Sequence, residues 1–207
     1  RISGSAGTAL YADGANVVTV RGCEIFGSRN GIYVFYGSYQ PTNWRIEDNL
    51  IYDVTEDGIR SAGRDVWIVS NTIVADAGND AIEQTYQYST NYIYNNILSV
   101  DGSGGACIRL ASDGSYITSD YNDLYARNGA VVGRSSRGTH MLIGDWQTAT
   151  GEDKHSLSLD PRFVDPDGPD NVAGNEDDDY HLAPDSPCID AGEPAVGWTC
   201  GDVDLDS

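Results

Sequence analysis

The chain has 207 residues, of which 40% are hydrophobic, and its 32 acidic and 12 basic residues give a formal net charge of −20. The hydrophobic content is sufficient for a buried core, but the sequence lacks the apolar run of about 18 residues that a membrane-spanning helix needs. We expect no nucleic-acid partner, because no basic patch can displace counterions from phosphate groups. The acidic balance suits a soluble extracellular protein, a salty environment or a protein that binds divalent cations.

The two ends of the chain resemble interior sequence. Arg1 to Gly4 does not resemble a signal peptide, and the sequence stops abruptly at Ser207. We therefore expect a fragment of a longer chain or a processed piece.

A repeat dominates residues 1–138. At intervals of 22 to 26 residues, a ladder position is followed two residues later by an aliphatic one. The ladder positions are Cys23, Asn49, Asn71, Asn96 and Asn122, and the aliphatic ones are Ile25, Ile51, Ile73, Leu98 and Leu124. Residues 1–15 hold one partial repeat, because Leu10 matches the phase of Ile32. A period of this length indicates a stacked-repeat architecture.

Each repeat is predicted to consist of β-strands, because its apolar positions alternate with polar or aromatic ones at a local period of 2. No segment shows the sustained period of about 3.6 that indicates a helix. Further inward positions are predicted at Ile46, Ile68 and Ile93 and at Ile32, Ile59, Ile82, Ile108 and Val131. Glycine and Asx residues at the bends complete the pattern of a parallel β-solenoid. We therefore predict an all-β solenoid of about five coils.

The four ladder asparagines are expected to stack inside the solenoid. Successive coils lie about 4.8 Å apart, and each amide has two donors and an acceptor oxygen, so it can bond its copies above and below. The alternative is that these asparagines occupy surface turns.

Residues 139–207 are predicted to form an irregular, acidic C-terminal cap or tail, because the repeat phase is lost at Gly138. Within it, residues 139–159 are expected to form a cap or a side excursion. Cys23 and Cys107 are interpreted as small core residues, whereas Cys188 and Cys200 either pair or remain free. No CxxC spacing occurs, so a zinc site is not expected.

The coils resemble those of the pectin-lyase-like superfamily of right-handed parallel β-helix proteins. Residues 160–165, 179–182 and 186–192 resemble the DPxFVD…DYHL…SPxIDAG ending of secreted bacterial β-helix repeat proteins. The resemblance implies a right-handed β-helix outside the cell or on its surface, in a superfamily of lyases, hydrolases, epimerases and adhesins. Arg64 to Asn71 looks like the pectate-lyase motif vWIDHN, but Val69 and Ser70 replace its aspartate and histidine, so no catalytic residue carries over.

One outward row is a candidate substrate-binding surface. Tyr33, Arg60, Glu83 and Arg109 each follow an inward isoleucine, so stacked coils should place them in register. One interpretation is a surface salt-bridge row, which adds little stability. The other is a polysaccharide-binding groove, in which the arginines pair with sugar carboxylates or sulfates and Tyr33 stacks on a ring.

Two acidic groups are candidate Ca²⁺ sites. Asp53, Asp76 and Asp101 follow the ladder asparagines at one edge, and Asp165, Asp167 and Asp170 lie in an acidic loop that continues to Asp179. Stacked carboxylates repel unless a cation lies among them, and Ca²⁺ prefers oxygen ligands. The alternative is Asx turn chemistry. Asp202, Asp204 and Asp206 form a similar group near the end of the chain.

Outward aromatic residues are a further candidate for sugar binding. They are Trp67, Tyr92 and Tyr94 on adjacent coils, and Phe26, Tyr52 and Tyr125 elsewhere. Aromatic residues are also ordinary strand formers, so this pattern alone does not establish a binding surface.

The leading functional hypothesis is an extracellular carbohydrate-binding or polysaccharide-processing module, which as an enzyme would be a polysaccharide lyase or hydrolase. The rival hypothesis is a non-catalytic structural or adhesive segment of a surface or filament protein. Such a segment would show only ladders, and open coil ends that associate end to end with other copies.

Overall fold

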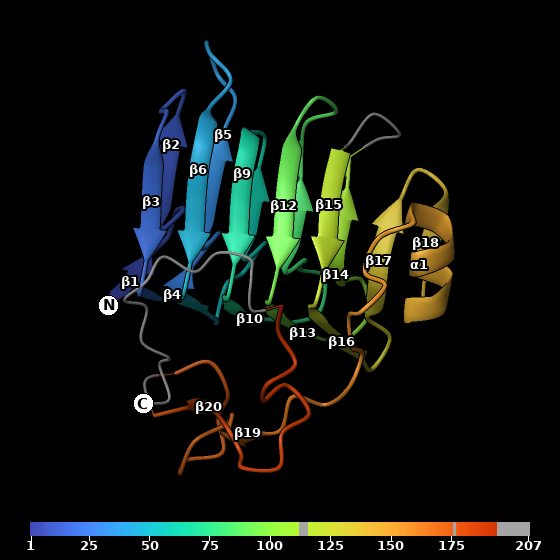
Figure 1. The fold of residues 1–207 in the computed structure, drawn as a ribbon. Helices are drawn as coiled ribbons and strands as arrows, with labels where there is room; N and C mark the ends of the chain where they lie inside the picture. The colour runs from blue at the N-terminus through green and yellow to red at the C-terminus, as the bar shows by residue number, and fades with distance from the viewer. Residues whose placement is uncertain (112–115, 176, 194–207) are drawn as a thin grey trace.

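The computed structural model describes residues 1–111, 116–175 and 177–193, and it confirms the predicted parallel β-solenoid. Three sheets run along the rod (Figure 1). Sheet A holds β1 (Ile2–Ser5), β4 (Glu24–Ser28), β7 (Leu50–Ile51), β10 (Thr72–Ala75), β13 (Ile97–Asp101) and β16 (Asp123–Arg127). Sheet B holds β2 (Leu10–Asp13), β5 (Ile32–Phe35), β8 (Ile59–Ser61), β11 (Ile82–Gln84), β14 (Ala106–Leu110), β17 (Val131–Ser135) and the antiparallel β18 (Gly138–His140). Sheet C holds β3 (Val18–Arg21), β6 (Thr42–Glu47), β9 (Arg64–Val69), β12 (Thr90–Tyr94) and β15 (Tyr116–Asp120).

The core consists of aliphatic side chains stacked coil upon coil. Ile46, Ile68 and Ile93 pair in register and are fully buried, as predicted. Ile32, Ile59, Ile82 and Ile108 form the equivalent stack in sheet B. One coil cannot bury such residues alone, so the stacking itself supplies most of the hydrophobic stabilisation.

The predicted place of Val131 in this stack is wrong. Ile108 pairs with Gly133, whereas Val131 pairs with Ala106. The physical reason is Trp146, because a Cβ atom on Gly133 would lie 2.2 Å from its ring. The indole therefore takes the space that an aliphatic side chain fills in the other coils.

The predicted amide ladder is confirmed. Asn49 Nδ2 donates to Asn71 Oδ1 at 2.9 Å, and the same bond joins Asn71 to Asn96 and Asn96 to Asn122 at 3.0 Å. Each Oδ1 also accepts the backbone N–H of the preceding ladder residue. The ladder ends on the fully buried Asp153, whose Oδ1 accepts from Asn122 Nδ2 at 3.1 Å.

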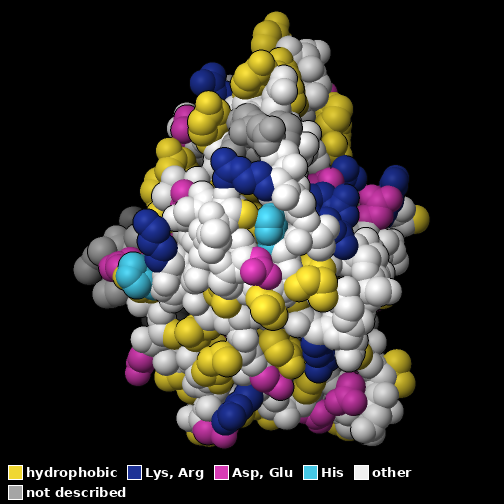
Figure 2. Space-filling view, turned by 90° about the vertical axis from the view of Figure 1, so that its right-hand side faces the viewer, with side chains coloured by type: hydrophobic (Ala, Val, Ile, Leu, Met, Phe, Trp, Pro, Cys, Tyr) yellow, Lys and Arg dark blue, Asp and Glu magenta, His cyan; other side chains and the backbone are white. Residues whose placement is uncertain are grey.

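Helix α1 (Ile143–Thr150) covers the end of the solenoid and was missed by the sequence analysis. It has only about two turns, and Trp146 is its one buried residue, so it shows no apolar stripe. Trp146 Nε1 donates to Asp153 Oδ2 at 2.8 Å, which ties the helix to the ladder. Figure 2 looks onto this end, where charged and polar side chains are interspersed with hydrophobic ones.

The C-terminal segment folds back under sheet A. Strands β19 (Phe163–Asp165) and β20 (Asp179–Leu182) form an antiparallel pair that contains the DPxFVD and DYHL motifs. Tyr180 packs on Tyr52 and Phe163, and Tyr52 stacks on Phe26 at 5.1 Å. Phe26 and Tyr52 were expected to be available for sugars, but they are only 7% and 2% exposed. The hairpin covers them.

Cys107 is fully buried and Cys23 is half-buried, in agreement with small core residues. The Cys188 thiol donates to Asp123 Oδ2 at 3.3 Å, and its predicted alternative partner Cys200 lies outside the described residues. Asp202, Asp204 and Asp206 also lie outside them. In the described ranges, no helix has the length and apolar character needed to cross a membrane.

Candidate functional site

The outer face of sheet B carries a continuous in-register row of side chains. The predicted neighbours Tyr33, Arg60, Glu83 and Arg109 do align across β5, β8, β11 and β14. Tyr11 on β2 and Arg134 on β17 extend the row at its two ends. We call these six residues the sheet B row. Register in a parallel sheet fixes their spacing at about 4.8 Å per strand.

The guanidinium groups in the sheet B row are held by carboxylates. Arg60 Nε lies 2.9 Å from Glu83 Oε2, and Arg60 also contacts Glu56 and Asp57 at 3.5 and 3.4 Å. Its Cζ lies 5.0 Å from the Tyr33 ring centroid, at the distance of a cation–π contact. Arg60 therefore has a fixed orientation between an aromatic ring and three acidic groups.

The expected salt-bridge row does not extend from Glu83 to Arg109. Arg109 forms an ion pair with Asp80 rather than Glu83, and Arg134 also contacts Asp80 at 3.5 Å. Asp80 belongs to a second ladder, in which Asn30, Asp57 and Asp80 each accept the backbone N–H of the next coil through Oδ1. The Asx residues at this bend thus both hold the coils together and position two arginines.

Two carboxyl groups in this surface have raised pKa values. Burial raises the pKa of Asp80 to about 6, although Arg109 and Arg134 oppose the shift. Burial also raises the pKa of Glu83, with Arg60 as the main opposing influence. Side chains with perturbed pKa values gather at functional sites more often than elsewhere, and structural ion-pair networks also produce them.

An aromatic cluster adjoins the row at its N-terminal end. Tyr11, Tyr33 and Phe35 contact one another with ring centroids 5.4 to 5.8 Å apart. Beyond the strand ends, Tyr86 contacts Tyr36 at 4.7 Å and Tyr88 at 5.5 Å. Tyr11 and Tyr88 are 55% and 57% exposed. Exposed rings of this kind can stack on the apolar faces of sugars.

The loop tyrosines Tyr36, Tyr86 and Tyr88 were missed by the sequence analysis, which followed strand positions only. A signal was present, because Tyr36 and Tyr86 each come four residues after an inward isoleucine, Ile32 and Ile82. Stacked coils place such equivalent offsets close together even outside the strands.

The aromatic residues on sheet C are less available. Trp67 and Tyr92 stack on each other with centroids 4.3 Å apart, and Arg45 lies 5.8 Å from the Trp67 ring. Each ring therefore uses one face for its neighbour. Trp67 lies between Tyr92 and Arg45 in the register of sheet C, so a ligand can reach little of its ring faces. Sheet C is therefore the weaker candidate surface.

A groove of about 570 Å³ lies at the bend between sheets A and B, beside the row. It is lined by Ala6, Gly27, Ser28, Arg29, Asp53, Thr55 and Glu56. Glu56 pairs with Arg29 at 2.6 Å and with Arg60 in the sheet B row. The groove and the row are therefore linked through one carboxylate.

The two predicted calcium regions approach each other at Asp53. Burial raises the pKa of Asp53, and Asp76 and Asp178 raise it further. Asp178 lies near the end of the acidic loop. Its Oδ2 atom accepts hydrogen bonds from the backbone N–H groups of Gly174 and Asn175. Its Oδ1 atom is buried and has no hydrogen-bond partner. Asp101, in contrast, pairs with Arg127 at 2.9 Å.

The other loop carboxylates have local roles. Asp170 Oδ1 accepts a hydrogen bond from the Val172 backbone N–H at 2.9 Å. The pKa of Asp165 is raised by two main causes, of which burial is the larger and the charge of Asp167 the second. Across residues 1–111, 116–175 and 177–193, no group of three or more His, Cys, Asp or Glu side chains has the arrangement of a metal site.

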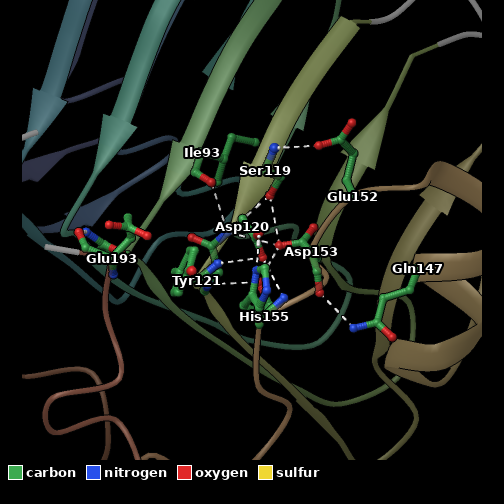
Figure 3. A network of polar contacts seen from close by, with 12 residues as sticks. Ile93, Ser119, Asp120, Tyr121, Gln147, Glu152, Asp153, His155 and Glu193 are labelled. Carbon is green, nitrogen blue, oxygen red and sulfur yellow. Dashed lines mark hydrogen bonds and ion pairs between the residues drawn. The ribbon is translucent and has the colours of Figure 1, made fainter. Parts of the chain in front are cut away.

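A polar network at the capped end was not predicted (Figure 3). His155 Nδ1 lies 2.8 Å from Asp120 Oδ2, and its ring stacks on Tyr121 at 4.9 Å. A pocket of about 110 Å³ beside them is also lined by Cys188. Burial and Asp123 raise the pKa of Cys188 to about 12, so its thiol stays protonated and is a poor nucleophile. This network is better explained as a structural contact. It connects His155 to Asp120 at the end of sheet C and so helps to close the end of the solenoid.

No family model matches the chain, and no curated protein or solved structure is significantly similar to it.

Proposed function

We propose that this chain is an extracellular or cell-surface module that binds a polysaccharide along the outer face of sheet B. The observation that supports the proposal is the sheet B row, in which two aromatic rings in edge-to-face contact are followed by ion-paired arginines without a break in register. A polymer lying along this face would meet rings first and guanidinium groups next.

The chemistry of the row suits an acidic glycan. The protein is strongly negative, so an acidic polymer is repelled from most of its surface. Arg60 and Arg109 remain 27% and 37% exposed in their side chains, so N–H groups not used by Glu83 and Asp80 can reach a sugar carboxylate or sulfate. Tyr33 and the loop tyrosines supply stacking faces.

Binding without turnover is the form of this proposal that the geometry supports best. A lyase or hydrolase needs an accessible acid or base, but the Asp80 side chain is only 3% exposed and Glu83 only 18%. Membership of the pectin-lyase-like superfamily, and the secreted bacterial origin that the resemblance of the tail implies, belong to the same proposal. The parallel solenoid and the tail hairpin support them.

A structural or adhesive segment is the second candidate function. It is favoured by one observation, namely that Arg60, Arg109 and Arg134 all have carboxylate partners within the protein. Because each of these arginines is already paired with a carboxylate of the protein, the row does not need a ligand to neutralise its charge.

A further part of the proposal concerns Ca²⁺. Asp53, Asp76 and Asp178 bring the edge and the acidic loop together. Burial raises the pKa of Asp76 as well, with Asp101 as the second cause. In the described residues these three carboxylates do not have the arrangement of a metal site, so a cation would have to draw them together. It would then relieve their repulsion and fasten the loop to the solenoid.

The test of the main proposal is binding to a panel of acidic and neutral polysaccharides. Arg60→Gln with Arg109→Gln should abolish binding while the variant keeps the circular dichroism spectrum of the folded parent. Its melting temperature should fall, because Asp80 is nearly buried and loses one of its arginine partners. A matched control is Arg45→Gln with Arg127→Gln, which removes two paired arginines from sheets C and A. Retained binding in the first variant, or equal loss in both, would assign the sheet B face a structural role.

A further inference from the structure

Charge is distributed unevenly along the sheet B row, because the second ladder at the neighbouring bend stops partway. Asp57 and Asp80 hold equivalent ladder positions in successive coils, and Ala106 and Val131 hold the next two. Ala106 still donates its backbone N–H to Asp80 Oδ1 at 2.8 Å, but it offers no carboxylate to the coil that follows. The ladder carboxylates therefore end at Asp80, two coils before the row ends at Arg134.

Arg60 lies in the part of the row where the ladder still carries carboxylates. It comes three residues after Asp57 in its own coil. Its side chain contacts three carboxylates at 2.9 to 3.5 Å, those of Asp57, Glu56 and Glu83. Arg29 adds a second positive charge, because it pairs with Glu56 at 2.6 Å. Negative charges still outnumber positive ones here, so the surroundings of Arg60 disfavour an anion.

Arg109 and Arg134 have the opposite surroundings. They come three residues after Ala106 and Val131, so neither has a ladder carboxylate in its own coil. Within the described ranges, the carboxylate that contacts them is that of Asp80, and both arginines share it. Two positive charges facing one negative charge leave an excess of positive charge at this end of the row.

The excess charge is presented to solvent. The Asp80 side chain is only 3% exposed, whereas those of Arg109 and Arg134 are 37% and 25% exposed. Arg134 Nη1 also donates to the Gly104 carbonyl oxygen at 2.7 Å, which restrains its orientation. The two arginines are register partners on β14 and β17, one strand spacing of about 4.8 Å apart. Two guanidinium groups at this separation can bond the same anionic group.

We propose that Arg109 and Arg134 form an anion subsite, which binds one carboxylate or sulfate group of an acidic polysaccharide. The inference rests on the proposed function and assigns its recognition of acid to one end of the sheet B row. Sugars that extend from the subsite toward Tyr33 are neutral, because further anionic groups would meet the carboxylates around Arg60. The ligand class is thus a sparsely charged acidic glycan rather than a uniform polyanion.

The subsite is tested by equilibrium binding of dextran, lightly carboxymethylated dextran and lightly sulfated dextran, which share one backbone. The parent should bind an acidic derivative about tenfold more tightly than dextran, because hydrogen bonds to charged groups are the stronger ones. The derivative that binds better identifies carboxylate or sulfate as the preferred group. Arg109→Gln with Arg134→Gln should lose this preference. The matched control, Arg45→Gln with Arg127→Gln, removes the same charge and should keep it.

The outcomes separate the subsite from the proposed function. Equal or undetectable affinity of the parent for the three dextrans would overturn the subsite, and so would a preference that persists in the Arg109→Gln/Arg134→Gln variant. The proposed function would survive either result if the parent bound another polysaccharide through sheet B. A parent that binds no polysaccharide of any kind would overturn both.

A second measurement uses the parent alone, because loss of both arginines leaves the nearly buried Asp80 without its partners and can prevent folding. Phenylglyoxal modifies arginine side chains, and peptide mass spectrometry measures the modification at each one. The acidic dextrans should slow modification of Arg109 and Arg134. Modification of Arg127, whose side chain is 49% exposed, should not change. Equal modification of Arg109 and Arg134 with and without the acidic dextrans would also overturn the subsite.

Discussion

At the residue scale, the ladder asparagines determine how one coil locks onto the next. The sequence was sufficient to place Asn49, Asn71, Asn96 and Asn122, because a buried amide must keep the phase of the aliphatic positions around it. It was not sufficient to place Asp153, since the ladder continues there through the C-terminal segment rather than through another repeat. The role of a single buried acceptor depends on which donors the fold brings to it.

Replacement of Asn71 by Ala should lower the free energy of unfolding by about 1–3 kcal/mol, because it leaves buried groups of two neighbouring coils without partners. Asn71 Nδ2 donates to Ile46 O, Val69 O and Asn96 Oδ1. Denaturant unfolding measures the change. The exposed Gln87→Ala is the control and should stay within about 0.5 kcal/mol of the parent. An equally small effect at Asn71 would show that the ladder is not energetically important.

Asp123 should make stability depend on pH. Burial raises its pKa to about 6, with backbone and thiol hydrogen bonds as opposing causes. The folded state therefore binds more protons than the unfolded state between the ordinary aspartate pKa and about 6, so this contribution to stability is lost as pH rises through that window. Asp123→Asn should flatten the change in melting temperature between about pH 4 and 6. As a control, substitution of the exposed Asp145 by Asn should leave this change in melting temperature as it is in the parent. Identical profiles of melting temperature against pH for the parent and Asp123→Asn would contradict this role of Asp123.

At the scale of elements, strands were predictable and the cap was not. The alternation of apolar residues gives strand positions directly, whereas α1 has one buried residue and no apolar stripe. The tail hairpin was known only as a motif, and its packing of Tyr180 on Tyr52 could not be inferred without the fold. The sheet B row was aligned correctly from Tyr33 to Arg109 because each of these residues directly follows an inward isoleucine, and the isoleucines stack in register. The pairing of Arg109 with Asp80 could not be predicted, because it depends on which carboxylate at the bend the arginine side chain can reach.

The indole of Trp146 should be the main support of the capped end. Trp146→Ala would leave a cavity over Gly133 and remove the donor to Asp153, at a cost of about 3–5 kcal/mol. Trp67→Ala, which truncates a half-buried indole on sheet C, should cost less. Thermal unfolding of both variants measures the difference, and an equal or smaller loss at Trp146 would rule out this role for α1.

At the scale of the whole molecule, the acidic surface decides which partners the protein can accept. Its loop and edge carboxylates lie close enough to raise one another's pKa values. The same negative field disfavours acidic ligands everywhere except where arginines gather, and sheet B displays three of them in one row. The same charge distribution therefore favours Ca²⁺ at the clustered carboxylates and an acidic glycan at the arginines of sheet B.

Ca²⁺ should raise the melting temperature of the protein, because a ligand that binds only the folded state stabilises it. EDTA should reverse the shift, and Asp53→Asn should abolish it. Asp101→Asn is the control, since Asp101 already pairs with Arg127 and its loss should leave the Ca²⁺ response intact. A melt that Ca²⁺ and EDTA leave unchanged, with no Ca²⁺ in elemental analysis, would end this hypothesis.

The most direct test of the central claim is oxidative footprinting of the tyrosines with and without a polysaccharide that binds. Tyr11 and Tyr88 flank the sheet B face, and Tyr116 on sheet C is 65% exposed. The glycan should protect Tyr11 and Tyr88 from oxidation, while Tyr116 should react as before. Protection of Tyr116 with no change at Tyr11 and Tyr88 would contradict the claim that sheet B is the binding face.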